Sequence, residues 1–128
     1  MNPTDPLTQS QLEILQAVWE LGAAGGTASE IWQATEATRQ LARTTVLTQV
    51  QRLHKKGWLR RSTRKGTVVF RARCDRATAE QQLARRFVTD YFDGSTTGLV
   101  RSLLGEGKVD RDEIARLREL LDDAEQQR

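Results

Sequence analysis

The sequence is poor in the residues from which disulfides and metal sites are built. Its single cysteine is Cys74, and its single histidine is His54. One thiol excludes an intrachain disulfide, and one thiol with one imidazole falls short of the roughly three or four ligands that a protein zinc site uses. We therefore predict no metal and no cofactor. Cys74 is expected to be a buried or idle thiol, with an intersubunit disulfide as the alternative.

Long apolar runs and catalytic motifs are missing as well. No apolar stretch approaches the ~18 residues of a membrane-spanning helix, and the first residues lack the basic and apolar regions of a signal peptide. These absences predict a cytoplasmic protein without membrane contact. The chain also has no glycine-rich phosphate loop and no nucleophile beside a partnered base, so we predict that it is not an enzyme.

Acidic residues are absent from residues 37–74, a segment that holds 11 Arg and Lys. The net charge is +5 over residues 1–75 and −2 over residues 76–128. A field of one sign favours polyanion binding and fast association. Aromatic residues make up only 5% of the 128 residues, which is little for one large core. We expect a small domain followed by an element that assembles with a partner.

Capping motifs predict where the first two helices begin. Thr8 is followed three residues later by Gln11, and Thr27 by Glu30, the spacing of a capping box. Apolar residues at helical spacing then predict a first helix that ends before Gly22 and a second that ends near residue 37.

A third helix is predicted over residues 43–56, closed by Gly57. At about 100° per residue, Val46, Val50 and Leu53 share one face. The opposite face carries hydroxyls and cations without an acid: Thr44, Thr48, Arg52 and Lys55. Such a face suits phosphates and base edges, although an ordinary solvated basic face has the same composition.

Two β-prone runs, 58–62 and 67–72, flank a polar turn over residues 63–66 and predict a hairpin. Its cations are Arg60, Arg61, Arg64 and Lys65. They suit a hairpin tip that contacts a phosphate backbone. The alternative, an edge hairpin kept from aggregating by its cations, explains them equally well.

Three helices followed by a hairpin predict the fold class: mainly α with a small β-hairpin, a winged helix-turn-helix followed by a C-terminal helical dimerisation region. The predicted DNA-binding domain is 1–74, with the third helix in the major groove and a basic wing, 60–71, on the backbone. Helices over residues 76–92, 97–104 and 111 onward are expected to bury their apolar faces against a second copy, giving a homodimer. The alternative is that they fold back on the winged domain of the same chain.

Four stretches resemble the BlaI/MecI family of penicillinase-type transcriptional repressors. They are L-T-Q-S-Q-L-E-I-L-Q-A-V-W, T-T-V-L-T-Q-V-Q-R-L-H-K-K-G-W-L, R-K-G-T-V-V-F-R-A and F-x-x-x-Y-F-D-G-S-x-x-G-L-V-x-S-L-L. The resemblance spans nearly the whole chain. It implies a homodimeric repressor of the antibiotic-response type that binds a dyad-symmetric double-stranded DNA operator.

The resemblance also implies which residues contact DNA. The positions that face bases or phosphates at the start of the recognition helix correspond to Arg43, Thr44, Thr45 and Thr48. Further along, Arg52 and Lys55 are expected to contact phosphates, with an internal structural pair as the alternative for Arg52. The wing adds Arg64 and Lys65. Family members commonly carry Ser-Pro where this chain has Ala42-Arg43, so the helix cap is weaker here and a different operator sequence is expected.

Regulation in the family implies a protease or sensor as a further partner. Repressors inactivated by proteolysis are cut at an Asn-Phe bond, and the matching positions here are Ser102 and Leu103. Because Asn is absent, control by cleavage at this bond is not expected. The clustered C-terminal cysteines of the copper-responsive branch are also absent, which argues against copper sensing.

A protein-interaction adaptor is the alternative function, in which the winged helix docks onto a protein instead of DNA. Acids on the third helix or exposed aromatics on the wing would favour it. The sequence has no acid in the third helix, and its three tryptophans fit packing roles at their predicted positions: Trp19, Trp32 and Trp58.

Overall fold

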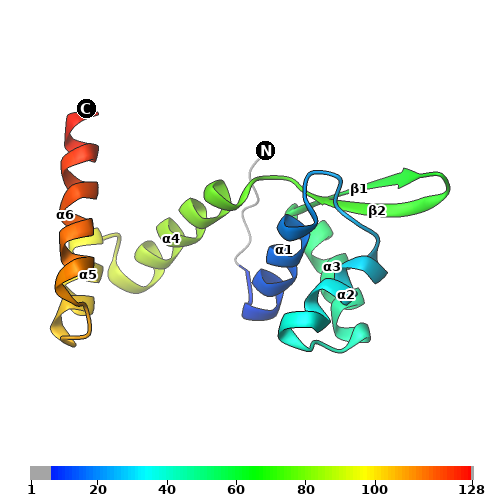
Figure 1. The fold of residues 1–128 in the computed structure, drawn as a ribbon, viewed down its shortest axis with the longest axis horizontal. Helices are drawn as coiled ribbons and strands as arrows, with labels where there is room; N and C mark the ends of the chain where they lie inside the picture. The colour runs from blue at the N-terminus through cyan, green and yellow to red at the C-terminus, as the bar shows by residue number, and fades with distance from the viewer. Residues whose placement is uncertain (1–6, 128) are drawn as a thin grey trace. The chain divides into compact units, whose positions relative to one another are not determined.

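The computed structural model describes residues 7–127, apart from the side chains of residues 38 and 39. The elements in chain order are α1 (Gln9–Leu21), α2 (Ala28–Arg39), α3 (Arg43–Lys56), β1 (Leu59–Arg64), β2 (Thr67–Ala72), α4 (Arg76–Phe92), α5 (Thr96–Gly105) and α6 (Arg111–Gln126) (Figure 1). Three helices followed by a two-stranded antiparallel hairpin form a winged helix-turn-helix, which confirms the predicted fold class.

The first two helices begin at the predicted capping boxes. The hydroxyl of Thr8 accepts from the amide of Gln11 (3.2 Å), whose side chain accepts from the amide of Thr8 (3.1 Å). Thr27 and Glu30 repeat this exchange at 3.1 and 2.9 Å. Each box satisfies amides that a helix start leaves without intrahelical partners. α2 runs to Arg39, two residues beyond its predicted end.

The third helix has the predicted limits. Gly57 ends it in the left-handed conformation at φ 91°, and its amide donates to the carbonyl of His54 (3.1 Å). At the other end, Ala42 stands in the N-cap position without a side-chain cap, as its methyl group requires. The helix therefore depends on its packed face more than on local capping.

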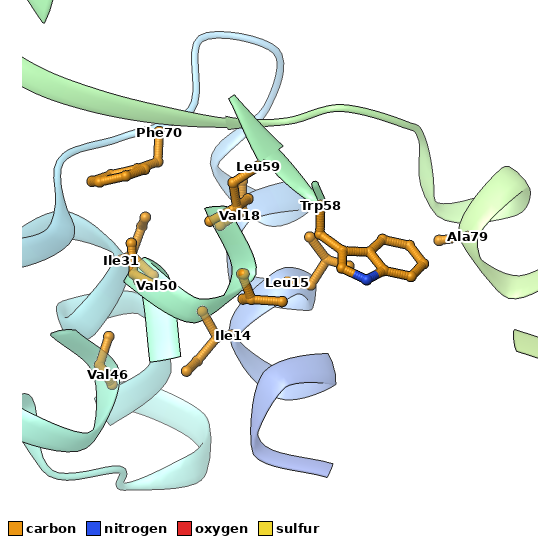
Figure 2. Close-up of a cluster of buried hydrophobic side chains, with 11 residues drawn as sticks. Ile14, Leu15, Val18, Ile31, Val46, Val50, Trp58, Leu59, Phe70 and Ala79 are labelled. Carbon is orange, nitrogen blue, oxygen red and sulfur yellow. The ribbon is translucent and has the colours of Figure 1, made fainter. Parts of the chain in front are cut away.

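That face closes the core of the winged domain. Val46, Val50 and Leu53 are fully buried, as predicted. They pack in one cluster with residues of α1 and α2, among them Ile14, Leu15, Val18 and Ile31 (Figure 2). Burying a side chain of this size contributes about 1.5–3 kcal/mol, so three inward residues suffice to hold a short helix in place.

The hairpin has a tighter turn than predicted. Arg64 pairs with Thr67, which leaves only Lys65 and Gly66 in the turn, at φ 52° and 81°. Positive φ at both residues is the type I′ geometry, whose twist matches that of the strands. The predicted four-residue turn over 63–66 was therefore wrong by two residues, because Thr63 and Arg64 still belong to β1.

The connector between α1 and α2 pairs with the base of the wing. Gly26 and Phe70 exchange backbone hydrogen bonds of 3.0 and 2.8 Å and form an antiparallel bridge. Gly25, at φ 67°, lies so close that a Cβ there would stand 2.0 Å from the carbonyl oxygen of Phe70. Only glycine fits this approach.

The first turns of α4 belong to the winged domain. Asp75 caps the helix by accepting from the amide of Thr78 (2.8 Å). Ala79 is fully buried in the same cluster as Trp58, whose ring points toward it in Figure 2. The chain divides into two compact units between Ala84 and Arg85, ten residues beyond the predicted domain limit at Cys74. The functional division into 1–74 and 75–128 stays a prediction.

The second unit holds the end of α4 with α5 and α6. Within the described part of the chain, neither α5 nor α6 buries a side chain, and Ile114 and Leu117 are only half-buried. Asp110 caps α6 by accepting from the amide of Glu113 (2.9 Å). The Glu113 carboxylate pairs with Arg116 (2.7 Å).

Candidate nucleic-acid interface

The outward face of α3 is the centre of the candidate interface. Thr44, Thr48 and Lys55 are exposed there, as predicted. Their spacing of four and seven residues places them on one side of the helix, opposite the buried Val46 and Val50. Hydroxyls near the helix start and a cation near its end match the order in which a recognition helix meets base edges and backbone.

Two residues on this face were missed by the sequence analysis. Gln51 is exposed between Thr48 and Lys55, and Leu47 is 37% exposed beside them. A glutamine amide both donates and accepts, as an adenine edge requires, and an apolar side chain suits a thymine methyl. Helical spacing could have identified Gln51, because it follows Thr48 by three residues and so lies on the same face. The prediction considered only hydroxyls and cations and therefore left out a neutral amide.

The other predicted contacts of α3 differ in their surroundings. Arg43 is exposed at the helix start, with its guanidinium carbon 5.6 Å from the centre of the Trp32 ring. Thr45 is half-buried, which limits it to contacts at the edge of the face. Arg52 is exposed, which suits the phosphate contact better than the internal pair that was its alternative.

A polar network fixes the inner edge of α3. Gln11 is 2% exposed, and its side-chain amide donates to the Gln49 side chain (3.0 Å). The ammonium of Lys56 donates to the Gln11 carbonyl oxygen (2.8 Å). This buried amide therefore joins the cap of α1 to two residues of α3. Lys56 serves this network, while Lys55 on the other side faces solvent.

The two cations at the tip of the wing, Arg64 and Lys65, differ in their contacts within the chain. Lys65 is exposed in the turn, beyond the last residue pair of the two strands. Arg64 donates from Nη2 to the carbonyl oxygen of Ala24 in the connector (3.3 Å), so part of its donor set is used within the chain. Hydrogen bonds from Thr27 hold the pKa of the Glu30 carboxyl below its usual value, and the charge of Arg64 lowers this pKa further. Lys65 is thus the better placed of the two for a phosphate.

The start of α3 offers backbone donors as well as side chains. Because Ala42 supplies no side-chain cap, the first amides of the helix remain available to a ligand. A helix N-terminus with free amides attracts anions, and Arg43 adds a full positive charge at the same place. The geometry combines a cationic helix start, suited to an anion, with an exposed face of polar side chains.

Other features of the chain do not form a second site. Among residues 7–127 there is no group of three or more His, Cys, Asp and Glu that could hold a metal ion. Burial raises the pKa of the Cys74 thiol, and the neighbouring Asp75 raises it further, so the unreactive thiol form is favoured. Ser102 and Leu103 are both exposed within α5. In the described part of the chain, no helix is both long and apolar enough to span a membrane.

Comparison with known proteins relates this chain to a family of repressors. Residues 7–123 match the model of the penicillinase repressor family. The methicillin resistance regulatory protein MecI of Mammaliicoccus sciuri is 22% identical over 120 residues, covering 94% of this chain and 96% of that protein. Among solved structures, monomeric BlaI of Bacillus licheniformis in complex with the blaP half-operator aligns with a TM-score of 0.49 and 20% identity, over 59% of this chain and 89% of that one. A MarR family protein from Bacillus stearothermophilus aligns with a TM-score of 0.46 and 19% identity, over 96% of this chain and 76% of that one.

Proposed function

The chain belongs to the penicillinase repressor family of DNA-binding transcriptional repressors and is not an enzyme, and from this premise we propose that it acts as a homodimer on a dyad-symmetric operator. The observation that carries the proposal is the outward face of α3, which is exposed, free of acids and ordered from hydroxyls to a cation. In a dimer, two such helices would enter successive major grooves on one side of the DNA.

Base reading is assigned to the middle of this face. Thr48 and Gln51 are exposed and short enough to approach base edges closely, and Thr44 lies one turn before Thr48. Arg52 and Lys55 are assigned to phosphates, since a long cationic side chain at the helix end reaches the backbone more readily than the groove floor. Thr45 would contact the backbone from the edge of the face.

The wing is assigned to the backbone of the same half-site. Lys65 supplies the phosphate contact, and Arg64 adds charge while it stays bonded to Ala24. A contact of this kind strengthens binding to any sequence, because each neutralised phosphate releases counterions. The wing therefore contributes affinity, and α3 contributes specificity.

Dimerisation is assigned to the second unit. It exposes several large apolar side chains: Phe87, Tyr91, Leu103, Leu104, Leu120 and Leu121. α6 has an apolar face and a polar face, a pattern typical of a helix that buries its apolar face against a partner. A second copy is the partner that a two-fold operator requires, because each half-site then receives one winged domain.

Relief of repression is proposed to involve a regulatory protease or sensor, as in a repressor of the antibiotic-response type. The bond between Ser102 and Leu103 lies inside α5, where the backbone is helical and must unwind before a protease binds it as an extended strand. We therefore propose that control does not use this bond. Access to operator DNA also implies that the protein works in the cytoplasm.

The experiment that tests the function is sequencing of genomic fragments bound by the purified protein at about 150 mM salt, which suppresses nonspecific binding. We expect a short inverted repeat with half-sites centred about one helical turn apart. The neighbouring genes would then identify the regulated pathway. Recovery of random fragments alone would show that the basic segment is a general polyanion surface and would overturn the proposal.

A further inference from the structure

The side chain of Trp32 links α2 to the start of the recognition helix. Its indole N–H donates to the carbonyl oxygen of Leu41 (3.2 Å), the residue before the N-cap of α3. The face of the same ring lies 5.6 Å from the guanidinium carbon of Arg43, the first residue of α3. One side chain therefore contacts both the turn and the first cation of the helix-turn-helix.

The turn that Trp32 contacts is also held by the amide of Gln40, which donates to the carbonyl oxygen of Thr35 (3.2 Å), and by Leu41, which packs against the core. Gln40 ends α2 in the left-handed conformation at φ 52°, which is uncommon for a residue with a Cβ. Ala42 begins α3 without a side-chain cap. The indole N–H adds a side-chain hydrogen bond to this turn at Leu41.

Arg43 is not enclosed by packing. It borders an open hollow of about 480 Å³ whose lining comes from α2, the turn and the start of α3: Trp32, Glu36, Gln40, Leu41, Ala42 and Arg43. An exposed arginine beside such a space has many rotamers available. The ring face of Trp32 favours the rotamers that keep the guanidinium at the helix start, whereas the Glu36 carboxylate on the same hollow attracts it toward α2.

We propose that Trp32 is a positioning residue that holds Arg43 at the start of the recognition helix and thereby contributes to operator selectivity. The proposal rests on the proposed function and adds a residue that does not itself touch DNA. Without the ring, Arg43 would still attract the DNA backbone of any sequence but would reach its base contact on the operator from a broader set of conformations. Specific binding would fall while nonspecific binding would not.

The expected effect is modest and measurable. A cation over an aromatic face at an exposed site corresponds to a change of about threefold in an equilibrium constant. We therefore expect Trp32→Leu to weaken operator binding about threefold and to leave binding to random DNA unchanged. Trp32→Phe keeps a ring face but loses the indole donor, so it separates the contact with Arg43 from the hydrogen bond to Leu41.

The chain provides a matched control. The indole N–H of Trp19 donates to the carbonyl oxygen of Cys74 (3.0 Å), and its ring lies 5.5 Å from the guanidinium carbon of Arg76. This pair has the same two interactions at the start of α4 instead of α3. Trp19→Leu should alter operator and random DNA binding equally, if at all.

A double-mutant cycle tests the proposal, with Kd measured on operator and random DNA for Trp32→Leu, Arg43→Gln and both together. We expect Arg43→Gln to weaken operator binding about tenfold, and Trp32→Leu to have almost no further effect in that background. Equal effects of Trp32→Leu in both backgrounds would overturn the proposal, because Trp32 would then act independently of Arg43. Trp32→Phe, run through the same cycle, keeps the test decisive if Trp32→Leu does not fold.

Failure of the proposed function would look different. In that case Arg43→Gln and Thr48→Ala would both leave the preference for operator over random DNA unchanged. Failure of the Trp32 inference alone would retain the losses from those two variants and remove only the coupling between Trp32 and Arg43.

Discussion

α3 and α6 have the same amphipathic sequence pattern, but they differ in how far their apolar faces are buried. Both helices carry apolar residues on one face and polar residues on the other. In α3 the apolar residues Val46, Val50 and Leu53 are fully buried, whereas in α6 Leu120 and Leu121 are 64% and 68% exposed. The pattern determines which face is apolar, but the rest of the chain determines whether something covers it.

The largest effect should come from the covered face. Leu53→Ala removes a fully buried side chain and should lower the free energy of unfolding by about 3 kcal/mol, because a cavity remains. Denaturation in urea measures it, with Leu120→Ala as the exposed counterpart. At protein concentrations low enough for monomer, the counterpart should change the free energy of unfolding by less than about 0.5 kcal/mol. Similar losses in both variants would mean that α6 is covered within its own chain.

The uncovered face should matter for association. Leu121→Glu places a charge on the exposed apolar face of α6 and should weaken a homodimer about thirtyfold, or about 2 kcal/mol. Sedimentation equilibrium measures this change, and Glu119→Gln on the same helix is the control. If the unchanged protein stays monomeric at every concentration, the assignment of this unit to dimerisation is wrong.

A helix cap tests local stabilisation, which should not depend on the unit that contains it. Thr27→Ala should cost about 1 kcal/mol of stability through loss of the α2 cap. Because hydrogen bonds from Thr27 lower the pKa of Glu30, the ionised carboxylate of Glu30 contributes stability. This contribution is fully present above the unfolded-state pKa of Glu30. It is lost as the pH falls through the lower folded-state pKa. Thr27→Ala removes the hydroxyl but keeps the backbone amide that donates to Glu30, so thermal unfolding between pH 7 and pH 3 should show only a modestly weaker pH dependence. The loss from Ser95→Ala, which removes the α5 cap, should not vary with pH, because the partner of Ser95 is the backbone amide of Gly98 and no carboxylate takes part in this cap.

The smallest effect compares the charges of the two units. Lys65→Gln should weaken binding to operator and random DNA equally and reduce the salt slope of log K by about one. Lys108→Gln removes an exposed cation from the second unit and should leave the slope unchanged. Binding titrations between about 50 and 200 mM salt resolve the difference. Over this range a protein that makes several phosphate contacts loses about 10³-fold or more in affinity. Equal slopes for Lys65→Gln and the unchanged protein would remove the wing from the interface.

The parts of the fold that the sequence predicted depend on local signals. Thr8, Thr27 and Gly57 act within three or four residues of their own positions, so each marked a helix limit correctly. The buried face of α3 was also predictable, because helical periodicity fixes which residues share a side. The turn of the wing was placed too broadly, since polar composition does not show where strand pairing stops.

What the sequence did not predict depends on contacts between distant residues. The bond between Lys56 and Gln11 joins residues 45 apart, and that between Trp19 and Cys74 joins residues 55 apart. No periodicity encodes such pairs, because they form only when the helices pack. The same holds for Arg43, which the family resemblance marked as a DNA contact without showing the ring of Trp32 beside it.

The bridge between Gly26 and Phe70 limits how the connector can vary in length. Loops between helices usually accept inserted residues, but here the amide and carbonyl of Gly26 must stay in register with those of Phe70. An insertion on either side of Gly26 would break the pairing or shift the wing strand by one residue, turning its buried side chains outward. The distance along the chain between α1 and α2 is therefore set by the wing, about 40 residues further along.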